Sequence, residues 1–234
     1  MSLKVEEFAK RRAMREGIPE SLLVPVVAVD QNAITEYVGE ITPIMPRSPE
    51  KALLVTVRAP DTTDRNLRVW NNPASNIYFQ ERQVWVHVDY HGYRRAYKKA
   101  MPSDNIDKFV LSHTMGRPMA RILGFNYIRL TPVTKKANTS SILSEIQGCR
   151  RYADPKFYKK LLEAKPRILY ADTTEMLLML DIMIGGNFAE EAYWAEYLFA
   201  PVGTPPPPDL IGSLRTYDWV CDGDLPSGGD FIQL

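Results

Sequence analysis

The spacing of apolar residues changes along the chain, and this change constrains the fold most strongly. In residues 84–89 valine occupies every second position. Successive side chains of a strand point to opposite faces, so the three valines are predicted to share one face. Other segments rich in β-branched and aromatic residues, separated by Pro, Asn and Asp, predict a mostly antiparallel sheet in the first half. The predicted strands are residues 24–29, 52–58, 67–70, 77–80 and 83–90.

In the second half the apolar residues follow helical spacing instead. The predicted helices are residues 92–101, 138–146, 155–164, 173–184 and 189–199. Either Asp172 or Thr173 can cap the fourth helix through its side-chain oxygen, and Gly185 and Gly186 tolerate the positive φ that ends a helix. The predicted fold class is therefore α+β, with a mostly antiparallel sheet first, helices second and an extended C-terminal arm.

Both ends of the chain carry segments that differ from this body. Residues 3–17 place apolar side chains between charges at roughly helical spacing, which predicts a short amphipathic helix that packs on its own domain or on a neighbouring subunit. Four prolines at 205–208 favour an extended spacer, and the apolar tail beyond them predicts an arm that docks on a neighbouring subunit or partner protein. The predicted units are an N-terminal helix (1–20), an α+β body (21–199) and a Pro-rich spacer with a docking arm (200–234).

Charge is segregated along the chain, although the formal net charge is only +1. Residues 94–136 hold ten basic and two acidic residues, whereas residues 170–234 hold eleven acidic residues and one arginine. A basic block of this kind attracts phosphate backbones. It also fits a merely solvated cationic face, and both interpretations stay open at this point.

Cysteine usage and hydropathy bear on the compartment. Cys149 and Cys221 stand in no metal-binding or redox spacing, so no disulfide framework is predicted. The N-terminus has no apolar signal-peptide core, and no stretch reaches the roughly 20 apolar residues that span a bilayer. The expectation is an intracellular protein, in the cytoplasm or within a particle, that is not secreted and contacts no membrane.

One pattern suggests chemistry. Residues 109–113 fit a strand that ends in His, a loop follows, a second strand begins near Asn126, and Asn138 opens a helix. Over about residues 109–145 this order resembles the core of the HNH, or His-Me finger, nucleases. The resemblance implies that His113 is the general base on a water, Asn126 the orienting residue and Asn138 the ligand of a divalent metal. Ser112 stands where that family usually has an acidic residue, and paired CxxC zinc knuckles are absent. His113 also fits an ordinary strand-end residue, and Asn138 a helix N-cap.

Basic and aromatic residues alternate closely from residue 93 to residue 99. Such a segment predicts a surface where cations contact phosphates while Tyr93 or Tyr97 stacks on an exposed base. In the alternative interpretation the two tyrosines, four residues apart, bury against the sheet. The predicted nucleic-acid-binding residues are Tyr93, Arg94, Arg95, Tyr97, Lys98, Lys99, Arg117, Arg121, Arg129, Lys135 and Lys136.

Three functions follow as hypotheses. The first is a structural or assembly protein of a larger viral or ribonucleoprotein particle, which needs no cofactor, contacts nucleic acid through its basic centre and associates through residues 200–234. The second is an HNH-like nuclease, which would need a divalent metal. The third is an intracellular adaptor that binds an acidic protein.

Overall fold

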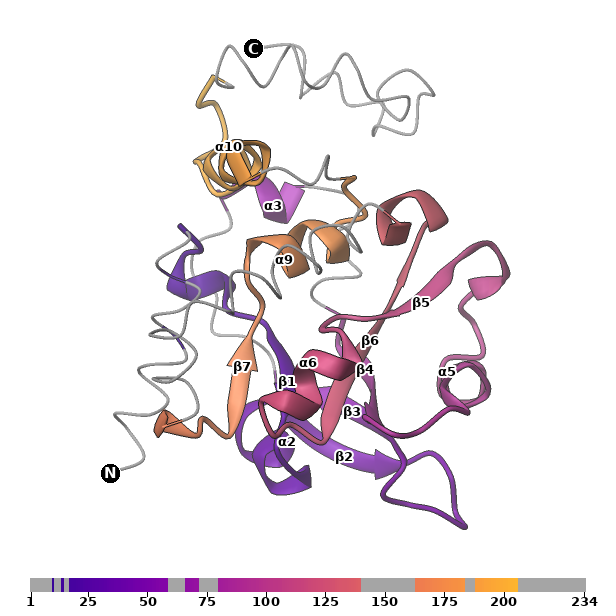
Figure 1. The fold of residues 1–234 in the computed structure, drawn as a ribbon. Helices are drawn as coiled ribbons and strands as arrows, with labels where there is room; N and C mark the ends of the chain where they lie inside the picture. Colours follow the sequence, from indigo (N-terminus) through magenta and orange to yellow (C-terminus); the bar gives the residue numbers. More distant parts are fainter. Residues whose placement is uncertain are drawn as a thin grey trace.

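An antiparallel sheet forms the centre of the molecule (Figure 1). The computed structural model describes residues 17–58, 66–71, 80–139, 163–183 and 188–205, with Lys10 and Met14. The strands follow the order β2-β3-β4-β6-β1-β7, and β5 pairs with β6 beside this path. Their bounds are β1 (Pro25–Ala28), β2 (Gly39–Pro43), β3 (Ala52–Val57), β4 (Arg82–His87), β5 (Val110–His113), β6 (Tyr127–Val133) and β7 (Ile168–Tyr170).

Strand β6 organises the sheet. Along one side it pairs with β4. Along its other side the beginning of β6 pairs with β1, where Val27 lies opposite Ile128, and its end pairs with β5, where His113 lies opposite Leu130. Every residue of β6 is buried. The β5 strand is therefore held at the C-terminal end of a fully buried strand.

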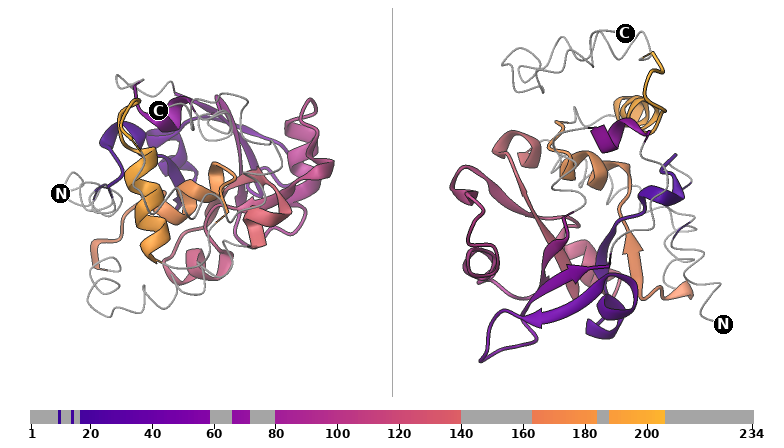
Figure 2. Two further views of the ribbon diagram at one scale, coloured as in Figure 1. Left: turned by 90° about the horizontal axis from the view of Figure 1, so that it is seen from above. Right: turned by 180° about the vertical axis from the view of Figure 1, so that it is seen from behind.

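The helices lie on separate sides of this sheet, as the views from above and behind show (Figure 2). The α9 and α10 helices pack together beyond one end of the strands (Figure 1). The α5 helix lies apart from them and packs on β3 and β4. The bounds are α2 (Gln31–Tyr37), α3 (Arg68–Asn71), α5 (Tyr93–Ala100), α6 (Arg117–Ile122), α9 (Thr173–Met179) and α10 (Phe188–Leu198), with 3-10 turns η1 (Glu20–Leu22) and η2 (Ile106–Lys108).

Two hydrophobic clusters follow from this arrangement. The smaller cluster lies between α5 and the sheet, where Ala96 and Tyr97 meet Val84, Val86 and Leu130. The larger cluster contains most of the buried apolar residues of β1, β7, α9 and α10. The alternation predicted for residues 84–89 holds for Val84 and Val86, but β4 ends at His87, and Val88 belongs to the larger cluster. Burying apolar area on both faces is the main source of stability for such a sheet.

The α+β class is confirmed by the antiparallel sheet and the later helices. Strands at 24–29, 52–58 and 83–90 and helices at 92–101, 173–184 and 189–199 correspond to elements of the structure, within a few residues at their ends. Asp172 is the residue that caps α9, and it forms a capping box with Glu175. The sheet also extends into the second half through β5, β6 and β7.

Two predicted segments have a different structure. Residues 67–70 were predicted as a strand, but residues 68–70 belong to the short α3 helix and Leu67 forms only an isolated β-bridge. The α6 helix occupies the predicted loop between β5 and β6. The β2, α2 and β7 elements were not predicted. Residues 77–79, the predicted helix at 155–164 except its last two residues, and most of the predicted helix at 138–146 lie outside the described residues.

Both chain ends are joined to the body at the positions that the structure describes. Ile18 and Leu22 are buried in the larger cluster. At the other end, Pro201 forms a β-bridge with Leu67, and the Val202 amide donates to the Asn66 carbonyl. The first residues of the predicted C-terminal segment are thus bonded to their own chain, and the predicted docking arm at 206–234 lies outside the described residues.

Candidate nucleic-acid interface

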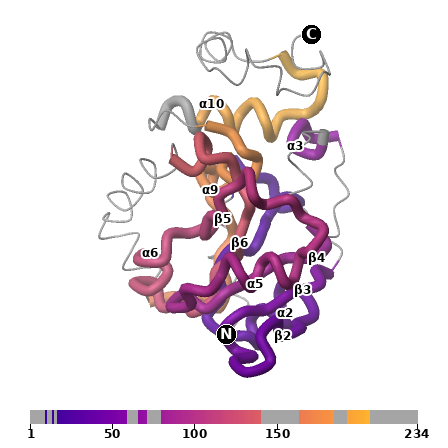
Figure 3. Tube along the Cα trace, turned by 90° about the vertical axis from the view of Figure 1, so that its right-hand side faces the viewer, coloured from indigo at the N-terminus to yellow at the C-terminus, as the bar shows by residue number. Residues whose placement is uncertain are grey.

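The α5 helix presents one apolar side and one cationic side. Ala96, Tyr97 and Ala100 lie on one side because of the 3.6-residue period, and they are buried in the smaller cluster. The helix lies on the side of the molecule that faces the viewer in Figure 3. We define the α5 basic surface as the exposed side chains of Arg94, Arg95, Lys98 and Lys99.

Two of these four cations are positioned by backbone carbonyls. Arg94 donates to the carbonyls of Ile106 and Phe109, at 3.0 and 3.3 Å. Lys99 donates to the Ile44 carbonyl at 2.8 Å, which joins α5 to the β2–β3 hairpin. Carbonyl contacts of this kind hold a cation in place without neutralising its charge, although Nη2 of Arg94 also lies 3.9 Å from Oδ1 of Asp107.

The remaining two cations differ in their partners. Lys98 donates to Asp107 at 2.7 Å, and this hydrogen bond is the largest cause that lowers the pKa of Asp107 below its ordinary value. Arg95 is exposed and makes no hydrogen bond or ion pair among the residues that the structure describes. Between residues 92 and 108 there are five cations and two carboxylates. The surface therefore keeps a positive excess after its internal ion pairs are counted.

Tyr97 does not have the role that the sequence suggested. It is 1% exposed, and its hydroxyl donates to Asp104 at 3.0 Å. Burial, followed by the nearby Asp104, raises the pKa of Tyr97. A ring enclosed in this way cannot stack on a base, so Tyr97 is removed from the predicted interface. Tyr93 is half-buried and meets the His113 ring edge-on, with 4.7 Å between ring centroids.

Arg129 is also removed from the predicted phosphate track. It is 0% exposed, because it lies on β6 opposite Trp85 of β4, inside the sheet. A phosphate could reach this guanidinium only if the sheet opened. The sequence does not indicate that Arg129 is buried, because β6 is buried on both faces and lacks the alternation that marks a half-exposed strand.

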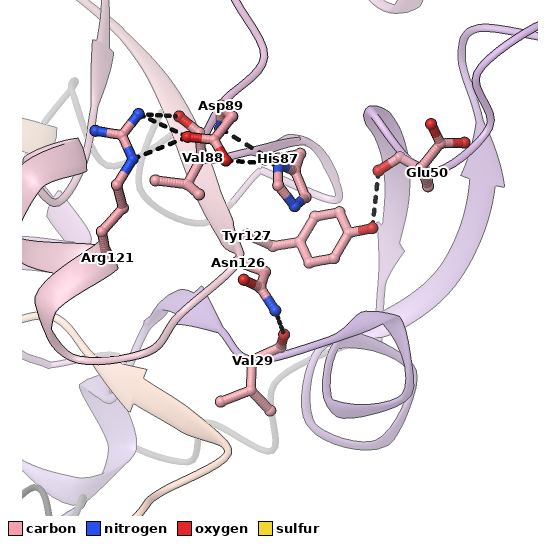
Figure 4. Close-up of polar contacts among 8 residues, drawn as sticks. All are labelled: Val29, Glu50, His87, Val88, Asp89, Arg121, Asn126 and Tyr127. Carbon is pink, nitrogen blue, oxygen red and sulfur yellow. Dashed lines mark hydrogen bonds and ion pairs between the residues drawn. The ribbon is translucent and has the colours of Figure 1, made fainter.

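Arg121 points to a different partner. Its guanidinium binds Asp89 in the turn after β4, with nitrogen–oxygen distances of 2.7 and 2.8 Å (Figure 4). The hydrogen bond from Arg121 is the largest cause that lowers the pKa of Asp89. This pair ties α6 to the end of β4, so Arg121 is already neutralised by an acid.

Lys135 and Lys136 are exposed on the helical residues 135–139, beyond the end of β6. Thr134 caps this helix through a hydrogen bond to the Ala137 amide, and Asp181 accepts from the Thr134 amide at 2.7 Å. Asn138 lies within the helix and is not its N-cap. The two lysines thus lie at the opposite end of β6 from the ion pair of Asp89 with Arg121.

The three residues of the nuclease pattern are distributed along β6. Asn126 precedes the strand and donates to the Val29 carbonyl at 2.7 Å, as Figure 4 shows. His113 lies opposite Leu130, and Asn138 lies five residues after the strand ends. At about 3.4 Å per residue, the seven steps from Asn126 to Val133 cover roughly 24 Å. The structure does not bring these three side chains together.

His113 and Arg117 form a small cluster near the first residue of α5. His113 ends β5, Arg117 begins α6, and both are half-buried. Burial, and secondarily the Arg117 charge, lowers the pKa of His113 to about 4. The imidazole is therefore neutral at pH 7. Neither residue was predicted to lie beside the other, because the contact depends on the turn between β5 and α6.

The described part of the chain holds no clear metal centre. No group of three or more His, Cys, Asp and Glu side chains among those residues could hold a metal ion. The His87 Nδ1 atom accepts from the Asp89 amide at 3.2 Å, which directs this nitrogen to the backbone.

Among the described residues, no helix has both the length and the apolar character that a membrane-spanning helix needs.

Some residues of the interface were not predicted. Arg82 donates to the Ala100 carbonyl at the end of α5, and Asp107 pairs with Lys98. Both lie near α5 only because the fold returns the chain there, and no local spacing signals this.

Comparisons of the chain with models of known families, with curated proteins and with solved structures find no match.

Proposed function

We propose that the chain is a non-catalytic component of a larger particle and that its α5 basic surface contacts the phosphate backbone of a nucleic acid. The observation that carries this proposal is the exposure of four cations on one side of an eight-residue helix, with the nearby carboxylate of Asp107 paired to only one of them at hydrogen-bond distance. Positively charged side chains on a fixed scaffold bind phosphates without reading the bases.

The geometry supports a positioned surface. Arg94 and Lys99 are held by backbone carbonyls on either side of the helix, so their charges are presented from a fixed frame. A pre-positioned cation loses less side-chain entropy on binding than a free one does. Arg95 adds an exposed guanidinium with no partner of its own among the described residues.

The HNH-like nuclease receives no support from this geometry. A metal held by Asn138 would lie far from a phosphate at His113 and Asn126, because β6 separates the two asparagines. The neutral His113 imidazole could accept a proton at pH 7. However, a general base needs its substrate within hydrogen-bond reach, and the partners that the pattern implies are elsewhere.

A charge-reversal experiment tests the proposal. Arg95→Glu combined with Lys98→Glu changes two cations that hold no backbone carbonyl, so the fold should persist. Anisotropy with a labelled single strand and with the matching duplex should show weaker binding. The slope of log K against log salt should fall by about 0.7 to 0.9 for each phosphate that the variant no longer neutralises.

A matched control carries the same charge change. Lys10→Glu with Lys165→Glu replaces one lysine from an exposed ion pair, Lys10 with Glu20, and one exposed lysine near β7 at the far side of the sheet. This control should bind like the unmodified protein. Equally weakened binding in both variants would reduce the effect to net charge alone. If no polynucleotide binds at low salt while polyglutamate does, the adaptor hypothesis replaces this one.

A further inference from the structure

Among the buried polar atoms that have no hydrogen-bond partner in the described residues, two belong to the end of β5 and the start of α6. They are Nη1 of Arg117 and Nε2 of His113. His113 ends β5 and Arg117 begins α6 four residues later, and the Arg117 charge acts on the imidazole. A buried donor without an acceptor is destabilising, and a buried guanidinium more so than a neutral group. The pair therefore marks a position where an acceptor from outside the chain would be stabilised.

The position of His113 follows from the alternation of β5. Leu111 is buried in the same cluster as Ala96 and Tyr97 of α5. His113, two residues further, shares that face of the strand, and its ring meets Tyr93 at the start of α5. The cluster formed by Tyr93, His113 and Arg117 is thus continuous with the helix that carries the basic surface.

The electrostatic surroundings favour an anion. The causes that act on the His113 pKa are burial and the Arg117 cation, and no carboxylate contributes. Arg94, next to Tyr93 in the sequence, is held by the carbonyls of Ile106 and Phe109, just before β5. A neutral imidazole can donate one N–H, and a guanidinium can donate several. Together they match the oxygens of a phosphodiester, which carries one negative charge.

We propose that Arg117 and His113 form a binding position for one backbone phosphate, adjoining the α5 basic surface. Nη1 of Arg117 and the Nε2–H of His113 donate to the phosphate oxygens, and Tyr93 supports the imidazole from its edge. This assignment rests on the proposed function, since it names one phosphate position within the same interface. All three residues are half-buried but the two donor atoms are buried, so a phosphate reaches them once the side chains of His113 and Arg117 turn outward.

The position predicts a spectroscopic response. An anion beside the imidazole stabilises its protonated form, so a bound phosphate should raise the pKa of His113 from about 4. The chain has three histidines, so their NMR signals can be assigned by single substitutions such as His113→Asn. Inorganic phosphate between pH 4 and 6 is a monoanion like the phosphodiester, and it serves as the simplest probe.

The experiment compares His113 titrations of the full chain in phosphate and in chloride at equal ionic strength, and then with a short oligonucleotide. We expect the pKa of His113 to rise by about one unit or more with both phosphate probes. Arg117→Gln should remove this response, whereas Arg167→Gln should retain it. Arg167 pairs with Glu36 beside β7 and lies away from α5.

Each outcome is informative. A His113 titration that is unchanged by both probes, while the oligonucleotide still binds and still depends on Arg95 and Lys98, overturns the phosphate position and leaves the proposed function standing. A response to inorganic phosphate but not to the oligonucleotide also overturns it, because the site would then take a free anion. A response that survives in Arg117→Gln has the same consequence. The response of His113 to the two probes is measured on the unmodified protein, so that part of the test does not depend on how the variants fold.

Discussion

The environment of His113 illustrates how one side chain depends on its place in the fold. It ends an edge strand, yet α5 covers it through Tyr93, and burial outweighs the exposure that a strand end usually has. Burial is the first cause of its lowered pKa and the Arg117 charge is the second. This low pKa has a direct consequence for stability against pH.

His113 should make the protein less stable as the solution becomes acidic. Between its ordinary pKa of 6.5 and its folded value of about 4, the unfolded chain binds a proton that the folded chain does not. The free energy of unfolding should therefore fall as the pH falls, by at most about 1.4 kcal/mol per pH unit. The contribution is complete above 6.5 and is lost on the way down to about 4.

Urea unfolding at several pH values measures this effect. His113→Asn should flatten the dependence between pH 6.5 and 4, while His91→Asn, at an exposed position, should leave it as in the unmodified protein. A dependence that is identical in the His113 variant would show that other groups cause it. The acids with lowered pKa values, Glu20, Asp89 and Asp107, are present in all three proteins, so their effect on stability is common to them and the comparison isolates His113.

The exposure of individual side chains in the interface could be predicted from the sequence for some residues and not for others. The exposure of the α5 cations was predictable, because helical period separates them from Ala96 and Tyr97. The burial of Arg129 was not, since it depends on both faces of β6 being covered by segments distant in sequence. The ion pair of Arg121 with Asp89 likewise requires the path of α6 past the end of β4.

Among the helices and strands, local propensity predicted those whose apolar residues recur with a clear helical or strand period, and it failed for the shortest ones. Residues 67–70 contain β-branched and aromatic side chains, but residues 68–70 lie in α3 and Leu67 forms a β-bridge with Pro201. The guanidinium of Arg68 lies 4.4 Å from the ring centre of Tyr197 and donates to the Tyr197 hydroxyl and the Thr204 carbonyl. These contacts join α3 to α10 and to the segment after it.

Arg68 should therefore hold residues 201–204 against the body. Arg68 is 5% exposed, so Arg68→Met would remove its hydrogen bonds to the Tyr197 hydroxyl and the Thr204 carbonyl. We expect a decrease of about 1–3 kcal/mol in the free energy of unfolding. The Val202 amide, which donates to the Asn66 carbonyl, should exchange with solvent at least tenfold faster.

Arg58→Met provides the control for this prediction. Arg58 also donates to carbonyls, those of Thr35 and Glu36, but it is exposed and lies near α2. Exchange at Val202 should be unaffected in this variant. Unchanged exchange in Arg68→Met would mean that the β-bridge between Leu67 and Pro201 holds the segment without the arginine.

Across the molecule, the proposed nucleic-acid interface and the start of the C-terminal segment lie in different places. The α5 basic surface lies on one face of the sheet, and α10 with residues 199–205 lies beyond the end of the strands (Figure 1). The apolar, acidic residues 206–234 follow Pro205 in the sequence. Nucleic-acid contact and assembly are therefore proposed for different parts of the molecule, which can be tested separately.

Removal of residues 206–234 should leave the body folded and lower the oligomeric mass or abolish the retention of a partner protein. The cut follows Pro205 because residues 201–204 bond to Asn66, Leu67 and Arg68 of the body. Circular dichroism reports the body, and light scattering reports the mass. A truncated chain that unfolds while keeping its mass per folded particle would show that the segment is an internal part of the domain.

The proposed contact between α5 and a phosphate backbone is tested most directly by hydrogen exchange of the full chain with and without a single-stranded oligonucleotide. Protection should increase over residues 93–100 and 106–117, which include α5, the η2 turn, β5 and Arg117. Exchange in α10 and at residues 199–205 should stay as it was. Protection at α10 or at residues 135–139, with none over 93–117, would contradict the assignment of the interface to α5.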